Sequence, residues 1–474
     1  MAQTTAGGTA APLVDPGVLE RVLTAALRRG GEFAEVFVED RRATSAVLDD
    51  GRVEELASGR DRGAGVRVVV GETTGYAHTA DLSDAGLLAA AEAAAAVARD
   101  LPAGSRTVAL SEHRAPRPND VAVAPEDVPK ARKIELLARA DAAARGAGSA
   151  VSQVSAAYGD SRRRILVANS EGVLTADDQV RSRFSVSVVA LGDSGMQTGY
   201  ETAAFTVGFE LFDTVEVEAI AQTAARRALG KLTARPAPSG EMPVVLASGS
   251  GGILFHEACG HGLEADHVAK DASVYAGRVG ELVASPLVTL VDDGTMGPEW
   301  GSFAVDDEGH PAGRTVLVDN GVLTGYLWDY LRARKEGRAS SGNGRRQSYR
   351  HLPMVRMTNT FLLNGTEEPD ELIAQTPSGV YVAKLGGGQV NTATGDFVFG
   401  TTEAYLIEHG RITEPLRDAN LIGNGPDVLR RIDAVANDFA MGPGTCGKDG
   451  QSVPVGCGQP TLRIAAVTVG GTAQ

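Results

Sequence analysis

The segment from Gly249 to His267 decides how the rest of the chain is interpreted. It reads Gly-Ser-Gly-Gly-Ile-Leu-Phe-His-Glu-Ala-Cys-Gly-His-Gly-Leu-Glu-Ala-Asp-His. A glycine-rich entry and a short apolar run lead into a stretch that is dense in imidazole, thiol and carboxylate groups. These are the side chains that bind metals and carry protons, so this segment is the first candidate for a functional site.

A His-Glu pair on a helix, followed by a second histidine one turn later, is typical of zinc peptidases. Two imidazoles hold the metal, and the glutamate acts as general base for a water molecule. Their usual spacing is i, i+4, but His256 and His261 are five positions apart. In a straight α-helix that spacing rotates the two side chains about 140° apart. Both can face one metal only if the helix widens locally by a π-bulge, and Gly260, which has no Cβ, is a suitable place for it.

Spacing alone leaves other ligand pairs open. Glu257 and His261 are at i, i+4, and His256 and Cys259 are at i, i+3. A helix with ordinary, partly buried polar residues is also compatible with the pattern. Three residues that follow are candidates for side chains that orient the ligand imidazoles, although a simple helix end explains them equally well: Glu264, Asp266 and His267.

Zinc requires a third protein ligand and accepts Cys, His or carboxylate. Cys446 lies in a glycine-dense loop, Gly442 to Gly450, with Lys448 close by, which is compatible with a thiolate. The alternative is a small buried residue. Cys457 has the pattern of a cysteine at the edge of a strand, where burial is the simpler interpretation.

Composition restricts the class of protein. The chain has 474 residues, a net charge of −15 and no long basic run, which argues against a nucleic-acid partner. Three cysteines do not make a disulfide framework and fit a reducing compartment. The N-terminus lacks the features of a secretory signal, and no apolar run is long enough to span a membrane. We therefore expect a protein of a reducing compartment with no membrane association.

Hydrophobic periodicity predicts an α+β fold. Residues 1–14 are expected to be a flexible N-terminus, and 15–235 an α+β region of antiparallel strands and helices with two lobes, at about 15–100 and 126–235. Its first helix is expected to begin at Asp15-Pro16, and short strands are expected at 34–39 and 43–48. After the boundary at Pro236 to Gly240, residues 240–474 are predicted to form a β-rich domain that carries the metal-site helix.

Several long motifs, in order, resemble the TldD family in the TldD/PmbA group of metallopeptidases. The resemblance covers nearly the whole chain and is clearest from about residue 240 onward. It is carried by the His-Glu-x-x-x-His segment and by three later stretches: Ser341 to His351, Arg356 to Thr360 and Gly444 to Gly456. Two cysteines are extra to the family pattern, Cys259 inside the first motif and Cys457 after the last.

The resemblance implies a zinc-dependent protease with His256, His261 and Cys446 as metal ligands and Glu257 as catalytic base. It also implies a cytoplasmic protein that forms a heterodimer with a PmbA/TldE-type paralogue lacking the metal motif, although a homodimer stays open. The implied substrates are unfolded or leader peptides. We expect such peptides to add as a strand to an exposed sheet edge.

Other interpretations of the same residues remain. A non-catalytic subunit with a structural zinc site is one, although such a site has no use for the free carboxylate of Glu257. A metal hydrolase acting on a non-peptide amide is another. For the oxyanion of a hydrolase, or for substrate contacts, the sequence offers three neighbouring candidates in a Gly- and Arg-rich loop: Tyr349, Arg350 and His351.

Overall fold

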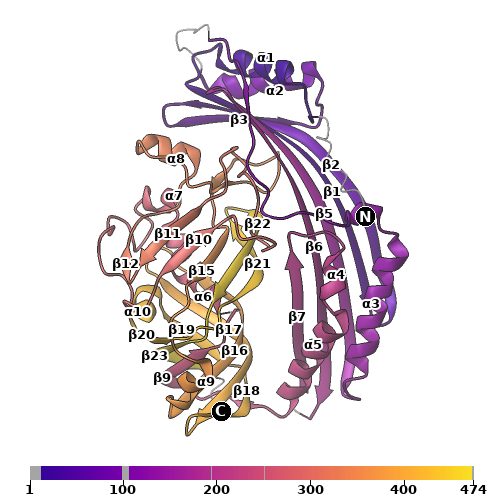
Figure 1. Cartoon of the computed structure of the whole chain (residues 1–474), viewed down its shortest axis with the longest axis vertical. Helices are drawn as coiled ribbons and strands as arrows, with labels where there is room; N and C mark the ends of the chain where they lie inside the picture. The colour runs from indigo at the N-terminus through magenta and orange to yellow at the C-terminus, as the bar shows by residue number, and fades with distance from the viewer. Residues whose placement is uncertain (1–11, 99–105, 194, 250, 472–474) are drawn as a thin grey trace, which may run out of the picture.

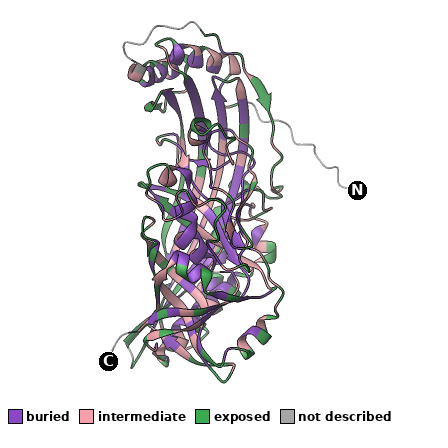
Figure 2. Cartoon of the chain, turned by 90° about the vertical axis from the view of Figure 1, so that its left-hand side faces the viewer, coloured by how far each residue is buried: buried purple, intermediate pink, exposed green. Residues whose placement is uncertain are grey.

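A computed structural model describes residues 12–98, 106–193, 195–249 and 251–471. The predicted flexible N-terminus, 1–14, therefore lies outside the described residues except for its last three. Two halves stand side by side, an N-terminal sheet of long strands and a strand-rich C-terminal half (Figure 1). Buried residues run along the strands of both halves (Figure 2). In the described part of the chain, no helix combines the length and apolar character needed to cross a membrane.

The N-terminal half is built on one seven-stranded sheet with the order β3-β2-β1-β5-β6-β4, and β7 also pairs with β6. All of its pairings are antiparallel except the parallel pairing of β4 with β6. The strands are β1 (Phe33–Asp49), β2 (Arg52–Val70), β3 (Thr73–Thr79), β4 (Ser111–His113), β5 (Val151–Asn169), β6 (Val173–Gly192) and β7 (Gly195–Phe205).

Helices cover the two ends of this sheet separately (Figure 1). At one end α1 (Pro16–Leu27) and α2 (Asp84–Ala94, extended by the 3₁₀ turn η1, Ala95–Ala98) pack on one apolar core. At the other end α3 (Lys130–Arg145) and α5 (Val217–Leu232) pack on a second core, near the short η2 (Pro125–Asp127) and α4 (Leu211–Thr214). The long strands β1 and β5 contribute to both cores, so the two lobes share one sheet.

The start of α1 follows the sequence expectation, because the Asp15 side chain accepts a hydrogen bond from the Gly17 amide and Pro16 occupies the first turn. The strands predicted at 34–39 and 43–48 are instead one continuous strand, β1. Their polar junction did not end the strand because β1 pairs with β2 on one side and β5 on the other, which satisfies its backbone throughout.

The C-terminal half contains two larger sheets. The first has the order β12-β11-β10-β15-β22-β21. Its strands are β10 (Leu290–Asp293), β11 (Arg314–Asp319), β12 (Val322–Leu323), β15 (Asn359–Leu362), β21 (Ala440–Lys448) and β22 (Gln451–Gln459). A separate two-stranded pair, β13 (Gly344–Arg345) with β14 (Met354–Val355), comes between β12 and β15 in the chain.

In the second sheet β16, β9, β23, β19 and β17 pair in a closed circuit, because β17 also pairs with β16. Its strands are β8 (Arg235–Pro236), β9 (Gly240–Leu246), β16 (Ser378–Val390), β17 (Asp396–Glu408), β18 (Arg411–Arg417), β19 (Asn420–Asn424), β20 (Ile432–Val435) and β23 (Leu462–Gly470). Three short helices accompany the two sheets: α8 (Tyr330–Lys335), α9 (Pro369–Ala374) and α10 (Gly425–Arg430).

The segment singled out from sequence lies between these two sheets. It forms α6 (Gly252–Phe255), the π-helical turn η3 (His256–Gly260), the 3₁₀ turn η4 (His261–Leu263) and α7 (Ala265–Val268). Turn η3 contacts β15 of the first sheet and β16 and β17 of the second. The predicted α+β class is confirmed, as is a β-rich C-terminal half that carries the helix with the candidate site.

Candidate metal centre

The helix widens where the histidine spacing required it to widen. The His261 amide donates a hydrogen bond to the carbonyl of His256, which is the i→i+5 bond of a π-helix. The two imidazole rings consequently lie on the same side of the helix, with centroids 5.0 Å apart and planes at 83°. The predicted π-bulge is confirmed, and an α-helical geometry would have separated these side chains.

Gly260 ends this turn in a position that no larger residue can occupy without rearrangement. A Cβ built on Gly260 would lie 2.2 Å from Sδ of Met357, a fully buried residue of the C-terminal core. The glycine therefore allows the widened turn to pack closely against the chain that leads into β15.

The hairpin of β21 and β22 brings Cys446 to the two histidines. Its Sγ lies 3.4 Å from Nε2 of His261. One ligand atom from each of His256, His261 and Cys446 lies within 4.8 Å of the others, and all three side chains are buried. The segment expected to be a glycine-rich loop is in fact strand β21, in which Cys446 pairs with Val453.

Two observations show that this cluster suits a metal ion. Both ring nitrogens of His256 are buried and have no hydrogen-bond partner in the described structure. A buried imidazole left without a partner is unfavourable, and a metal ion would satisfy one of its nitrogens. Two imidazole nitrogens and one thiolate sulfur also form a donor set that zinc accepts at catalytic sites.

Electrostatics favour the thiolate form of Cys446. Burial alone would raise the pKa of this thiol, but His256 and His261 outweigh burial and lower the pKa to about 4. Burial would lower the pKa of His261, yet Glu264 and Cys446 raise that pKa to about 9. Without a metal, the group thus favours a thiolate with protonated imidazole; metal binding would displace the proton.

Glu257 lies beside the cluster and keeps contact with solvent. Its Oε2 is 3.8 Å from Nε2 of His261, and its side chain is 22% exposed, compared with 9% for that histidine. A carboxylate in this place can exchange protons with a water molecule near the ligand atoms.

Cys259, an alternative ligand that the sequence spacing allows, points back into its own helix. Its thiol donates to the carbonyl of Phe255 at 2.8 Å. Burial raises its pKa to about 12, so the thiol stays protonated. Cys457 is different, because it faces the His256 imidazole together with Cys446, and the sequence pattern of a strand-edge cysteine did not reveal this.

A series of charged side chains contacts His261 on its Nδ1 side. Its Nδ1 lies 3.0 Å from Oε2 of Glu264, and Nζ of Lys448 donates to the same oxygen at 2.8 Å and to Oδ1 of Asp266 at 2.7 Å. His267 is more distant, with Nε2 3.8 Å from Glu264. Burial would raise the pKa of Glu264, but His261 and Lys448 lower it to about 2.

This arrangement fixes the direction of the ligand atoms. Because Glu264 occupies the Nδ1 side of His261, Nε2 is left to face Cys446. Glu264, Asp266 and His267 themselves lie close enough to be considered a second metal cluster. However, the ammonium of Lys448 already pairs with the carboxylates of Glu264 and Asp266, in the place that a metal ion would take.

Comparison with known proteins agrees with the resemblance noted in the sequence. Family models for the PmbA/TldA metallopeptidase domain 1, central domain and C-terminal domain match residues 34–98, 124–232 and 239–471. A "Metalloprotease TldD homolog" from Haemophilus influenzae is 42% identical over 452 residues, which cover 94% of each chain. This chain belongs to the PmbA/TldD family.

A relative named "Zinc metalloprotease TldD homolog", from Saccharolobus solfataricus, is 32% identical over 296 residues, which cover 62% of this chain and 66% of that one. Among solved structures, TldE from Thermococcus kodakarensis has the same fold. It aligns with a TM-score of 0.76 at 20% identity and covers 96% of this chain and 100% of its own.

In this member of the PmbA/TldD family, the loop residues predicted as oxyanion donors or substrate contacts have the following described contacts, which lie outside the histidine-cysteine cluster. Tyr349 is buried against the N-terminal sheet, and Arg350 forms an ion pair with Asp61 of β2. The ring of His351 hydrogen-bonds to Ser348, while its carbonyl accepts from Tyr76 of β3. Their described contacts join the C-terminal half to the N-terminal sheet.

Proposed function

We propose that this chain is a zinc-dependent peptidase whose metal is held by His256, His261 and Cys446. The observation that carries the proposal is the buried His256 imidazole, which has no hydrogen-bond partner among the described residues yet faces a second imidazole and a thiolate. The family assignment and the names of the relatives support a metallopeptidase. The choice of zinc is supported by the nitrogen and sulfur donors and by the name of one relative.

A zinc ion in this place would supply Lewis acidity and bring the pKa of a water molecule towards about 7. Glu257 is then the group that accepts the proton of the attacking water and later donates it to the leaving amine. Glu264 holds His261 in the orientation and tautomer that present Nε2 to the site. The ion pair with Lys448 keeps Glu264 ionised for this task.

The proposed substrate is a peptide in an extended conformation. Strand β21, which carries Cys446, is the last strand of its sheet, and its outer edge pairs with no strand of the described chain. A peptide added along that edge would bond through its main chain, close to the cluster, with little dependence on side chains. Such binding requires an unfolded segment, which fits unfolded or leader peptides as substrates.

For partners, we propose a heterodimer with a PmbA/TldE-type paralogue, with a homodimer as the alternative. The similarity of fold to TldE supports a related second subunit. A cytoplasmic location is supported by three cysteines that are all buried and free, which fits a reducing compartment.

The test is hydrolysis of an unstructured peptide in ¹⁸O-labelled water, followed by mass spectrometry. Zinc-loaded protein, alone and with its paralogue, is compared with chelator-treated protein. The proposal predicts cleavage with one labelled oxygen in the new carboxylate only in the zinc-loaded samples. Equal cleavage after chelation would exclude a zinc-dependent mechanism. Stable zinc binding with no cleavage in either assembly would instead favour a non-catalytic subunit with a structural zinc site.

A further inference from the structure

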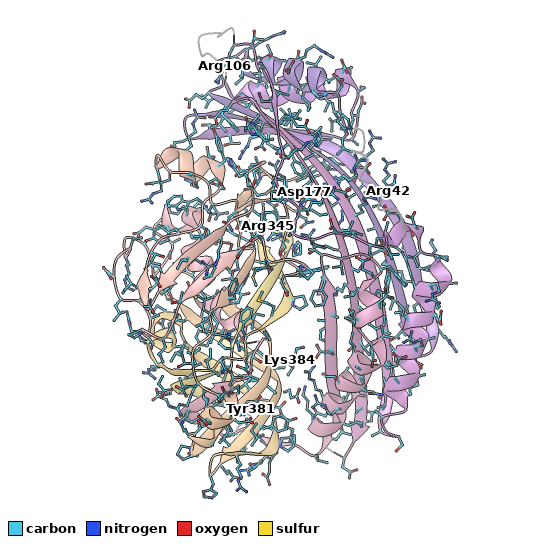
Figure 3. The ribbon with its side chains drawn as sticks, in the orientation of Figure 1. Arg42, Arg106, Asp177, Arg345, Tyr381 and Lys384 are labelled. Atoms are coloured by element: carbon cyan, nitrogen blue, oxygen red, sulfur yellow. The ribbon has the colours of Figure 1, made fainter. Side chains whose placement is uncertain are left out.

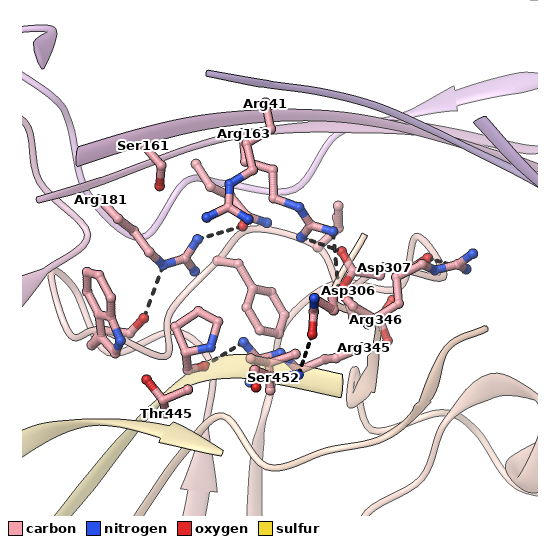
Figure 4. A pocket seen from close by; sticks show the side chains of 17 residues that line it. Arg41, Ser161, Arg163, Arg181, Asp306, Asp307, Arg345, Arg346, Thr445 and Ser452 are labelled. Atoms are coloured by element: carbon pink, nitrogen blue, oxygen red, sulfur yellow. Dashed lines mark hydrogen bonds and ion pairs between the residues drawn. The ribbon is translucent and has the colours of Figure 1, made fainter. Parts of the chain in front are cut away.

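A cavity of about 320 Å³ lies between the N-terminal sheet and the β21–β22 hairpin. Figure 4 shows Arg41 and Arg163 reaching towards it from the N-terminal strands, while Thr445 and Ser452 come from the hairpin on the opposite side. The cavity is therefore walled by both halves of the molecule. The proposed chemistry of the metal centre makes no use of it.

Two nearly fully buried guanidinium groups line this cavity without a carboxylate partner among the described residues. Arg181 donates to the carbonyls of Trp300 and Ser302 and to the side-chain oxygen of Gln179. Arg345 donates to the carbonyls of Met357 and Pro454. Neutral acceptors satisfy hydrogen bonds, but they give these buried positive charges no direct ionic partner.

The carboxylates of the wall form no ion pair with Arg181 or Arg345 in the described part of the chain. Arg163 forms ion pairs with Glu39 and Asp307, and Asp307 acts on Arg345 and Arg181 only from a longer distance. Burial and the neighbouring Glu308 raise the pKa of Asp306 well above its usual range, which favours its neutral form. Burial and the guanidinium groups of Arg345 and Arg163 also lower the pKa of Arg181, as expected where like charges crowd.

The remaining wall is mixed in character. The guanidinium of Arg345 lies over the ring of Phe303 and that of Arg181 over the ring of Trp300, with distances of 5.2 and 5.9 Å to the centroids. Val305 and Pro454 add aliphatic surface, and the cavity also has hydroxyl groups in its lining. A ligand that fits this chemistry has one anionic group and a small apolar body, and the volume is at the lower end for small-molecule sites.

We propose that this cavity binds the carboxylate of a short peptide, at its free C-terminus or on an acidic side chain, with Arg181 and Arg345 as the groups that recognise it. Planar guanidinium groups match a carboxylate geometrically, and the aromatic and aliphatic wall would cover the adjoining residue. The choice of a peptide as carrier of the carboxylate rests on the proposed peptidase function, whereas the anion site itself does not.

The cavity is on the reverse side of the strand that carries the proposed metal ligand. Thr445 precedes Cys446 in β21, and successive side chains of a strand point to opposite faces. A carboxylate bound here is therefore separated from the metal centre by the hairpin. It would anchor a peptide, or sense a product, without touching the scissile bond.

Binding can be measured in chelator-treated protein, so that cleavage plays no part. Of the two tryptophans, Trp300 lines the cavity, and a Trp328→Phe background leaves it as the sole tryptophan reporter. A tetrapeptide without acidic side chains is titrated as free acid and as C-terminal amide, with inorganic phosphate as competitor. We expect the acid to change the fluorescence of Trp300 and to bind at least about tenfold more tightly than the amide. Equal binding of acid and amide, or phosphate binding more tightly than the acid, would overturn the proposal.

Arg41 and Arg42 provide a matched pair of exposed variants. Arg41 lines the cavity, whereas Arg42, the next residue of β1, lies on the side of the sheet away from Arg345 (Figure 3). Arg41→Ala should weaken binding of the free acid about threefold at low salt, and Arg42→Ala should leave it unchanged.

The buried variant Arg345→Gln should abolish the preference for acid over amide. If that variant fails to fold, equal affinities of Arg41→Ala and Arg42→Ala would still contradict the proposal. Because cleavage is not measured, loss of the peptidase proposal would leave this result interpretable.

Discussion

Sγ of Cys446 lies 3.4 Å from Nε2 of His261, although 185 positions separate the two residues in the chain. The contact depends on the β21–β22 hairpin, which lies against the widened helical turn. It joins two distant segments of the C-terminal half into one buried group of nitrogen and sulfur ligands.

Replacing Cys446 by serine should weaken zinc binding by more than about 100-fold, because loss of a ligand should exceed the about 10–100-fold effect of losing a supporting residue. Affinity would be measured by competition with a chromophoric chelator. Cys259→Ser is the matched control, since that thiol is equally buried but bonds to its own helix. Similar zinc affinities in the two variants would exclude Cys446 as a ligand.

Glu264→Gln should lower zinc affinity by about 10–100-fold while the protein stays folded. The amide keeps the size of the side chain but removes the negative charge that faces His261 and Lys448. The same competition assay, together with circular dichroism, separates an effect on the ligand from unfolding. If zinc affinity does not change, His261 does not need Glu264 to orient it.

Gly260→Ala should destabilise the fold by about 1–3 kcal/mol, the usual range for overpacking. Its new methyl group would meet Sδ of Met357 at 2.2 Å. Gly230→Ala in α5 is the control, because a Cβ there meets nothing within 4 Å and alanine is the better helix former. Urea unfolding should show a loss only for the first variant. Equal stability of the two variants would mean that the widened turn can accommodate a methyl group at position 260.

The ion pairs of Glu403 should make part of the stability depend on pH. This carboxylate of β17 binds Arg226 and Arg227 of α5, and although burial opposes the shift, these partners lower its pKa to about 2 from a usual value of 4.5. Because the folded pKa is depressed, the stabilisation is complete above pH 4.5 and is lost as the pH falls towards 2. We expect Glu403→Gln to cost about 1–2 kcal/mol at pH 7, less than the full shift because the carboxylate retains contact with water.

Urea unfolding of wild type and Glu403→Gln at pH 7 and at pH 3.5 checks this prediction. The difference between their free energies of unfolding should shrink at the lower pH. A difference that stays constant would show that Glu403 does not titrate with the expected depression.

The local features of the site could be predicted because they follow from covalent geometry. The five-residue separation of His256 and His261 requires a wider turn wherever both face one metal, and Gly260 could be recognised as its place. The α+β fold class follows from the local hydrophobic pattern, and the start of α1 follows from the capping residue Asp15.

Long-range relationships could not be derived in the same way. Residue type and the neighbouring Lys448 make Cys446 a candidate ligand, but only the family resemblance implies that it meets the two histidines. Its segment is a strand, although a loop is expected because its glycines show no apolar alternation. The interface between the two halves of the molecule likewise could not be predicted from the sequence. Tyr349 and Arg350 looked like active-site residues, since nothing local shows that their partners are on β2 and the sheet around it. The link from Lys448 to Glu264 has the same origin in tertiary packing.

Glu257 is proposed to carry protons beside a metal held by His256, His261 and Cys446, and the variant Glu257→Gln tests this role. Zinc content and hydrolysis of an unstructured peptide would be measured on the same preparation, with the paralogue present. We expect full zinc content and a cleavage rate reduced by about 10²–10⁴-fold. Undiminished cleavage by a variant with full zinc content would contradict the proposed role of Glu257.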